Sequence, residues 1–177
     1  CAHNTGEASQ YGRAVEARSN INLRREETDE ARFVSPDWHD LRLQSDSPYV
    51  DAGHDGETAG AYPYRDEVFF AGPDGDDANA GTSVAQAWGS LQVACGRLQP
   101  GQTLYLLPGE YEGTLELTGL RADDEPTTIR PREKGTVTLN AGGDPIGVEV
   151  ADCESVRIEG LRITGAGEMA VAVQDSP

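Results

Sequence analysis

The sequence predicts an all-β protein: a parallel β-helix, or solenoid, that begins with a short N-terminal capping α-helix. Three observations predict this fold. From residue 101 onward, short segments place an apolar residue at every second position, as a strand with one buried face does. Matching segments return at intervals of about 22 residues. Between them lie turns rich in Gly, Asn and Asp, such as "NAGGDP", "ADCES" and "TGAGE".

The repeat interval separates a solenoid from the alternative, an ordinary mixed sheet. Two interleaved tracks of apolar pairs share the interval, and "GVEVADC" at 147–153 matches "AVAVQDS" at 170–176 directly. Each coil of a solenoid buries its apolar face only against the next coil, so a fixed interval is expected there. We therefore predict, for residues 101–177, that one residue from each coil stacks in a single interior column: Leu106, Ile129, Val150 and Val173.

A helix is expected before the coils. Ser83, followed by Gln86, matches a capping box, which marks a helix N-terminus. Pro100 and Gly101 are typical of a helix end. An apolar stripe at helical spacing would cover the interior and the strand edges of the first coil. The stripe consists of Val84, Trp88, Leu91, Cys95 and Leu98.

The charge balance excludes several partners. The chain has 177 residues, of which 31 are acidic and 14 basic, so its net charge is −17. This excess disfavours nucleic acid, anionic lipid and bare polyanionic glycans. It suits a secreted or salt-exposed protein, and it could also be only an adaptation to habitat. No apolar run approaches the roughly 18 residues of a membrane span.

The three cysteines are too scattered for a disulfide framework or a zinc site, and the three histidines do not have ligand spacing. We expect no bridge between Cys95 and Cys153, which leaves Cys1 available to join another chain. Because the sequence starts at Cys1 rather than Met, we expect a processed form or an excised piece. Lipidation of Cys1, as in a bacterial lipoprotein, is a further alternative.

Two stretches resemble a known family. "FFAGPDGDDANAGTSVAQAWGSLQVACGRLQPGQTLYLLPGEY" and "SVRIEGLRITGAG" are similar to the opening segment and the recurrent coil of secreted right-handed parallel β-helix proteins, the pectate-lyase-like superfamily. The resemblance covers about residues 66–177, and Gln102 stands where the family usually has Asp. It implies a right-handed helix and a secreted protein. It implies no single function, because the family includes lyases, glycosidases, epimerases, adhesins and inert surface proteins.

An earlier stretch resembles the other end of the same family. "FVSPDWHDLRLQSDSPYVDAG…GAYPY" is similar to the segment that closes many of these helices. We therefore expect a closing element in 1–64, an opening strand with an Asp/Gly loop and a capping helix in 65–100, and the first three to four coils in 101–177. The chain would be either the junction of two tandem helices or a subunit that closes its neighbour. Both alternatives leave the last rung, around Val171 and Val173, open to another chain.

The best candidate for a metal site is the loop "PDGDDANAG". Its side chains could offer hard oxygens to Ca²⁺, although such loops also fold on their own Asx-turns. The calcium candidates are Asp74, Asp76, Asp77 and Asn79. A second acidic loop contains Asp51, Asp55 and Glu57.

A basic group, Arg130, Arg132 and Lys134, could bind a uronate carboxylate of a polysaccharide, or could merely balance nearby acids. A paired-carboxylate mechanism needs two acids about 5–10 Å apart. We expect Glu149 and Glu159 to lie on different faces of one coil, with no acidic partner on the rung above.

We assign no catalytic residue and expect no lyase activity. The predicted function is an extracellular structural β-helix module that assembles end to end with neighbouring copies or with β-helix domains of the same protein, in a tandem surface protein or as a fibre subunit. Cys1, Val171 and Val173 would form the intermolecular contacts. The alternatives are a fragment of a secreted polysaccharide lyase or glycoside hydrolase, and a carbohydrate-binding or adhesive module.

Overall fold

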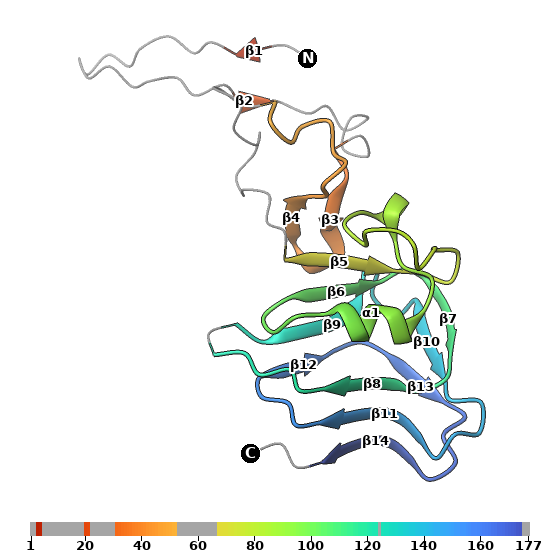
Figure 1. Ribbon diagram of the computed structural model, residues 1–177. Coiled ribbons are helices and arrows are strands. Elements are labelled where there is room, and N and C mark those ends of the chain that lie inside the picture. The colour runs from red at the N-terminus through yellow and green to blue at the C-terminus, as the bar shows by residue number, and fades with distance from the viewer. Residues whose placement is uncertain (1–2, 5–19, 22–30, 53–66, 124, 175–177) are drawn as a thin grey trace. The chain divides into compact units, whose positions relative to one another are not determined.

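The computed structural model describes residues 3–4, 20–21, 31–52, 67–123 and 125–174 (Figure 1). The chain divides into two compact units, Cys1–Arg65 and Asp66–Pro177. Among the described residues, most elements are strands and one is an α-helix, in agreement with the all-β prediction.

The first unit contains two small antiparallel pairs. Strand β1 (His3–Asn4) pairs with β2 (Asn20–Ile21), and β3 (Phe33–Ser35) pairs with β4 (Asp40–Leu43). A 3-10 turn at Pro36–Trp38 joins the second pair. The described core of this unit is small and consists of Ala31, Leu43 and Tyr49, with Phe33 and Val50 packed against it.

Three parallel sheets make up the second unit (Figure 1). After β5, the chain passes through the three sheets in the same order three times, and we call each passage a circuit. The first sheet consists of β12 (Val156–Ile158), β9 (Thr127–Pro131), β6 (Thr103–Leu106) and β5 (Val68–Ala71); the second of β13 (Arg162–Thr164), β10 (Val137–Asn140) and β7 (Gly109–Glu112); the third of β14 (Met169–Gln174), β11 (Ile146–Ala151) and β8 (Leu115–Thr118).

Apolar side chains at alternate positions form columns across these sheets. Each strand directs every second residue inward, and parallel pairing places the inward residues of successive circuits opposite one another. The members from the first two circuits are almost fully buried. The columns are Leu104–Ile129–Ile158, Tyr111–Leu139–Ile163, Leu115–Val148–Val171 and Leu117–Val150–Val173.

The predicted single column of Leu106, Ile129, Val150 and Val173 is wrong. Ile129 pairs with Leu104, whereas Leu106 lies opposite Pro131. Val150 and Val173 do pair with each other, but in the third sheet.

The cause of this error is that each circuit contains three strands rather than two. Strand β7 has the sequence Gly-Glu-Tyr-Glu, in which Tyr111 supplies the only apolar side chain, so it gave no clear alternating pattern. In addition, "VRIEGLRITG" forms two strands, β12 and β13, instead of one.

The helix begins later than predicted. Residues Val84–Gln86 form a 3-10 turn, and α1 runs from Leu91 to Arg97. Ser83 makes no side-chain capping bond, so the predicted capping box is wrong. Ser90 is the N-cap, and its hydroxyl accepts a hydrogen bond from the Val93 N–H at 3.2 Å.

A long-range bridge explains the late start of α1. Trp88 pairs in parallel with Ala71. The Trp88 N–H donates to the Phe70 carbonyl at 3.0 Å, and the Trp88 carbonyl accepts from the Gly72 N–H at 2.8 Å. A residue held in this way cannot belong to a helix. Trp88 is nonetheless buried, as the apolar stripe predicted.

Candidate functional site

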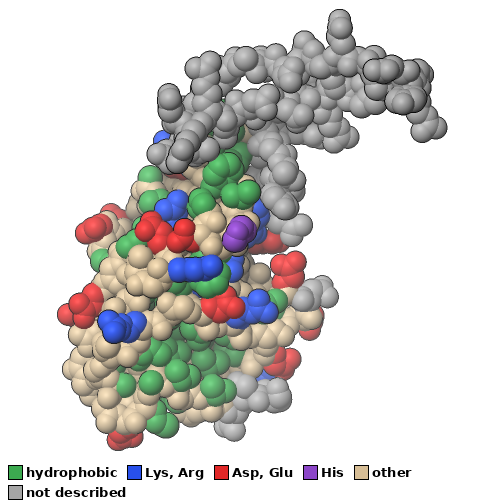
Figure 2. Space-filling model, turned by 180° about the vertical axis from the view of Figure 1, so that it is seen from behind, with side chains coloured by type: hydrophobic (Ala, Val, Ile, Leu, Met, Phe, Trp, Pro, Cys, Tyr) green, Lys and Arg blue, Asp and Glu red, His purple; other side chains and the backbone are tan. Residues whose placement is uncertain are grey.

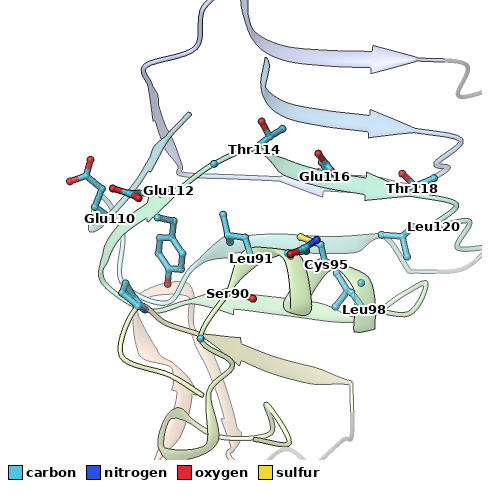
Figure 3. Close-up of a pocket in the computed structure, with 16 residues that line it drawn as sticks. Ser90, Leu91, Cys95, Leu98, Glu110, Glu112, Thr114, Glu116, Thr118 and Leu120 are labelled. Carbon is cyan, nitrogen blue, oxygen red and sulfur yellow. The ribbon is translucent and has the colours of Figure 1, made fainter. Parts of the chain in front are cut away.

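A groove lies between α1 and the edge formed by β7 and β8 (Figure 3). It has a volume of about 800 Å³. Leu91 of α1 and Leu98, which directly follows the helix, supply apolar side chains to one wall. Polar side chains from alternate positions of the first circuit line the other wall, namely Glu110, Glu112, Thr114, Glu116 and Thr118.

Strand alternation places these polar side chains in the groove. Tyr111, Leu115 and Leu117 point inward and are buried, so the residues between them face outward. Three of the outward residues are glutamates, and the described lining of the groove includes no Lys, Arg or His. The groove is therefore a region of negative potential. Sequence reasoning missed it, although the period-two row in "GEYEGTLELT" is a signal that could have identified it.

Glu149 has an acidic neighbour on the preceding circuit, whereas the following circuit places Ala172 opposite it. Glu116 on β8 lies directly opposite Glu149 on the adjacent strand β11. The amide of Gln174 donates a hydrogen bond to the Glu149 carboxylate at 3.0 Å. Two like charges in cross-strand register repel each other, so we expect the pair to be mildly destabilising.

Two ionisable side chains of the groove, Cys95 and Tyr111, have raised pKa values. Burial, together with the nearby Glu116 carboxylate, raises the pKa of Cys95 to about 12. A thiol with this pKa stays protonated at neutral pH and reacts slowly. Burial likewise raises the pKa of Tyr111, whose hydroxyl lies within 2.9 Å of the Ala71 carbonyl and 2.8 Å of the Leu107 carbonyl.

In the predicted calcium loop, Asp77 has a structural contact. Its Oδ1 accepts hydrogen bonds from the N–H groups of Gly89 and Ser90, both at 2.9 Å, and its Oδ2 accepts one from the Ser90 hydroxyl at 2.8 Å. The bond from the Ser90 hydroxyl is the main reason why the pKa of Asp77 is lowered. Asp77 therefore holds Ser90, the N-cap of α1.

The rest of this loop is also bonded internally. Asp76 accepts from the Ala78 N–H at 2.8 Å, as in an Asx-turn, and the Asn79 amide donates to the Ala87 carbonyl at 3.1 Å. Asp74 is exposed. No cluster of three His, Cys, Asp or Glu side chains suited to a metal ion occurs in the described part of the chain. The contacts favour the Asx-turn alternative, and the calcium site stays a prediction.

The predicted basic group lies along the end of β9 and the following turn. The Arg130 guanidinium lies 4.9 Å from the centre of the Tyr105 ring and forms an ion pair with Glu159 at 3.9 Å. Arg132 is 3.7 Å from the carboxylate of Glu133. The two arginines therefore contact nearby acids, as the charge-balancing alternative requires.

Lys134 is exposed in the turn that follows β9. Of the second acidic loop, Asp51 is exposed, whereas Asp55 and Glu57 lie outside the described residues, as does Cys1. Cys153 is buried and is not bonded to Cys95, in line with the expectation that the two form no bridge.

The last circuit exposes side chains that are buried in the circuits before it. Val171 and Val173 are 51% and 65% exposed, whereas their partners Val148 and Val150 are 1% and 7% exposed. Met169, on the same strand, is 47% exposed. Figure 2 shows that hydrophobic side chains gather on the part of the surface where the last strands lie.

The chain matches no protein-family model and no curated protein sequence. None of the helices in the described regions is long and apolar enough to cross a membrane.

Proposed function

We propose that residues 67–174 are the opening coils of a right-handed parallel β-helix, and that the protein is an extracellular structural module that joins another β-helical segment end to end. The repeated passage through three parallel sheets supports the helix. The strong preference of parallel crossover connections for right-handed geometry supports its hand. The acidic surface and the family resemblance of residues 66–177 support an extracellular location.

In this proposal the two ends of the helix differ. Helix α1 packs against β8 and β5, and its residues Leu91 and Ala94 are buried, as is Leu98 directly after it. Such a helix would act as a cap, because it keeps the apolar interior and the strand edges away from water. The last circuit has no comparable cover among the described residues.

The exposure of Val171 and Val173 is the observation that carries the proposal. Val171 and Val173 are the last residues of their two columns, and both are exposed on the edge strand β14. Fully burying a valine is worth about 1.5–3 kcal/mol, and these two are a little over half exposed, so covering both would yield roughly 2–3 kcal/mol. Main-chain hydrogen bonds along β14 would add to this.

We assign the cover to a second copy of the chain. If α1 caps one end, the last circuits of two copies can meet around a two-fold axis, which gives a closed pair. A fibre would need a second open end. The predicted end-to-end assembly would then stop at two copies.

Sedimentation velocity of the whole chain, from low to high micromolar concentration, tests this function. We expect a concentration-dependent dimer that is lost in V171K/V173K. Val84→Lys is the matched control, because Val84 is an exposed valine (37%) outside the last circuit, and this variant should still dimerise. Far-UV circular dichroism verifies that each variant is folded. A chain that stays monomeric throughout, or a V171K/V173K variant that assembles as the parent does, would contradict the proposal.

A further inference from the structure

We propose that the edge of β7 binds an extended, positively charged segment of another protein by β-strand addition. This interaction surface is separate from the last circuit and does not depend on the proposed dimer. It occupies the groove beside Glu110 and Glu112 (Figure 3).

The second sheet lacks an element that the other two sheets have. Beyond β6, the first sheet continues with the parallel strand β5. Beyond β8, the third sheet is packed by α1. Strand β7 is the last strand of its sheet, and residues 110–113 line the groove instead of pairing with a further strand. The groove therefore lies where the next strand of the second sheet would be.

The backbone of β7 presents unpaired groups to this groove. The N–H groups of Gly109 and Gly113 donate to β10 and its flank, to the carbonyls of Thr136 at 3.0 Å and Asn140 at 2.9 Å. Because successive residues of a strand direct their N–H and C=O groups to opposite sides, those of Glu110 and Glu112 point away from β10. In the described part of the chain, β10 is the one strand that pairs with β7, so these two N–H groups have no strand partner there.

The groove is large enough for a short strand. Its volume, about 800 Å³, lies in the range of pockets that enclose a drug-sized ligand. A strand that pairs with β7 would lie about 4.8 Å from it. Four residues matching Gly109–Glu112 would extend over about 13 Å.

The charges of the groove determine the chemistry of the partner. Glu110 and Glu112 lie two residues apart and therefore face the same side of the strand, and Glu116 adds a third carboxylate. The amide of Asn140 donates to Glu110 at 3.0 Å, and no cationic side chain lines the described groove. A strand with Lys or Arg at alternate positions would place its cations opposite these carboxylates.

There is a rival explanation for the glutamates. Charged side chains on an edge strand also serve to prevent pairing with other chains. In that case a basic peptide would be attracted by charge alone and would form no hydrogen bonds to the backbone of β7. The two explanations therefore differ in what happens to the N–H groups of Glu110 and Glu112.

Amide hydrogen exchange of the whole chain, measured by NMR with the capped peptide Lys-Thr-Lys-Thr-Lys, separates the two explanations. We expect the peptide to slow exchange at the amides of Glu110 and Glu112 and to leave most other amides unchanged. The same peptide with all five backbone amides N-methylated keeps its charge but cannot complete the ladder in either strand direction, so it should not protect these amides. A peptide with Glu in place of Lys should not bind.

Matched variants test the contribution of charge. E110Q/E112Q should weaken binding by about fivefold at low salt, the effect of losing two cross-strand charge pairs. The control E133Q/E168Q removes two exposed carboxylates outside the groove and should bind like the parent chain. The proposal is overturned if the peptide binds without protecting the amides of Glu110 and Glu112, or if N-methylation of the peptide has no effect. It is also overturned if E110Q/E112Q binds the peptide as tightly as the parent chain does.

Discussion

Replacing Ile129 with Ala should strongly destabilise the second unit. Ile129 is fully buried and lies between Leu104 and Ile158 on the neighbouring strands. The substitution removes three buried carbons, each worth about 0.8 kcal/mol, or about 2.4 kcal/mol together. The cavity left behind adds about 1 kcal/mol if the neighbouring residues only partly relax into it. We therefore expect a loss of about 3–4 kcal/mol in the free energy of unfolding.

Ile158→Ala is the matched control. Ile158 occupies the same column, but it is only partly buried and has a neighbouring strand on one side only. The same three carbons are removed from a site that is already open to water. We expect a loss of about 1 kcal/mol, because both the transfer term and the cavity term are smaller.

Urea unfolding followed by circular dichroism measures both losses. The experiment should be done at low micromolar concentration, where a second copy cannot cover Ile158. A domain of this size typically has an unfolding free energy of about 5–15 kcal/mol, so both variants should remain measurable. A loss below about 1 kcal/mol for I129A, or equal losses for the two variants, would refute the column arrangement.

Two further predictions concern backbone contacts and pH. Gly75→Ala should cost about 1–3 kcal/mol, because a Cβ there would collide with the Trp88 backbone. Gly96→Ala in α1 meets no atom within 4 Å and should stabilise the protein by up to about 1 kcal/mol; thermal unfolding of both variants checks the pair. The pKa of Cys95 is raised from 9.0 to about 12, so the folded state favours the protonated thiol. This contribution to the free energy of unfolding is complete below pH 9 and is lost as the pH rises from 9 to 12. Urea unfolding at pH 8 and pH 11 should show this loss, and C95A should reduce it without abolishing it, because the pKa of Tyr111 is shifted in the same direction.

The alternating strands could be predicted because their signal is local. Leu115 and Leu117 on β8, and Val148 and Val150 on β11, occupy every second position, and their burial confirms the inward face. The match between 147–153 and 170–176 also identified a true pair of neighbouring strands.

The number of strands in each circuit could not be read in the same way. The inward face of β7 carries only Tyr111 between two glycines, so the segment shows no alternation of apolar residues. The intervals between paired residues are unequal, because the turns that connect the three sheets differ in length. A single average interval therefore assigned residues of different sheets to one column.

The start of α1 and the groove depend on distant parts of the chain. Trp88 is held by Phe70 and Gly72, and this contact outweighs the local preference for a helix from Ser83. The groove becomes visible only when β7 is known to lie at the edge of its sheet. The alternating polar residues that include Glu110 and Glu112 can be seen in the sequence. The position of their strand at the edge of its sheet cannot, because it depends on long-range pairing.

The register of the parallel strands is the central claim of this account, and methyl–methyl nuclear Overhauser effects test it most directly. In the whole chain with labelled Ile, Leu and Val methyl groups, we expect contacts that link Leu104 to Ile129, Ile129 to Ile158, and Val150 to both Leu117 and Val173. These contacts fix the register of the first and third sheets, and an expected contact between Leu139 and Ile163 fixes that of the second. Strong contacts between Ile129 and Val150 in place of those with Leu104 and Ile158 would contradict the register and the coils inferred from it.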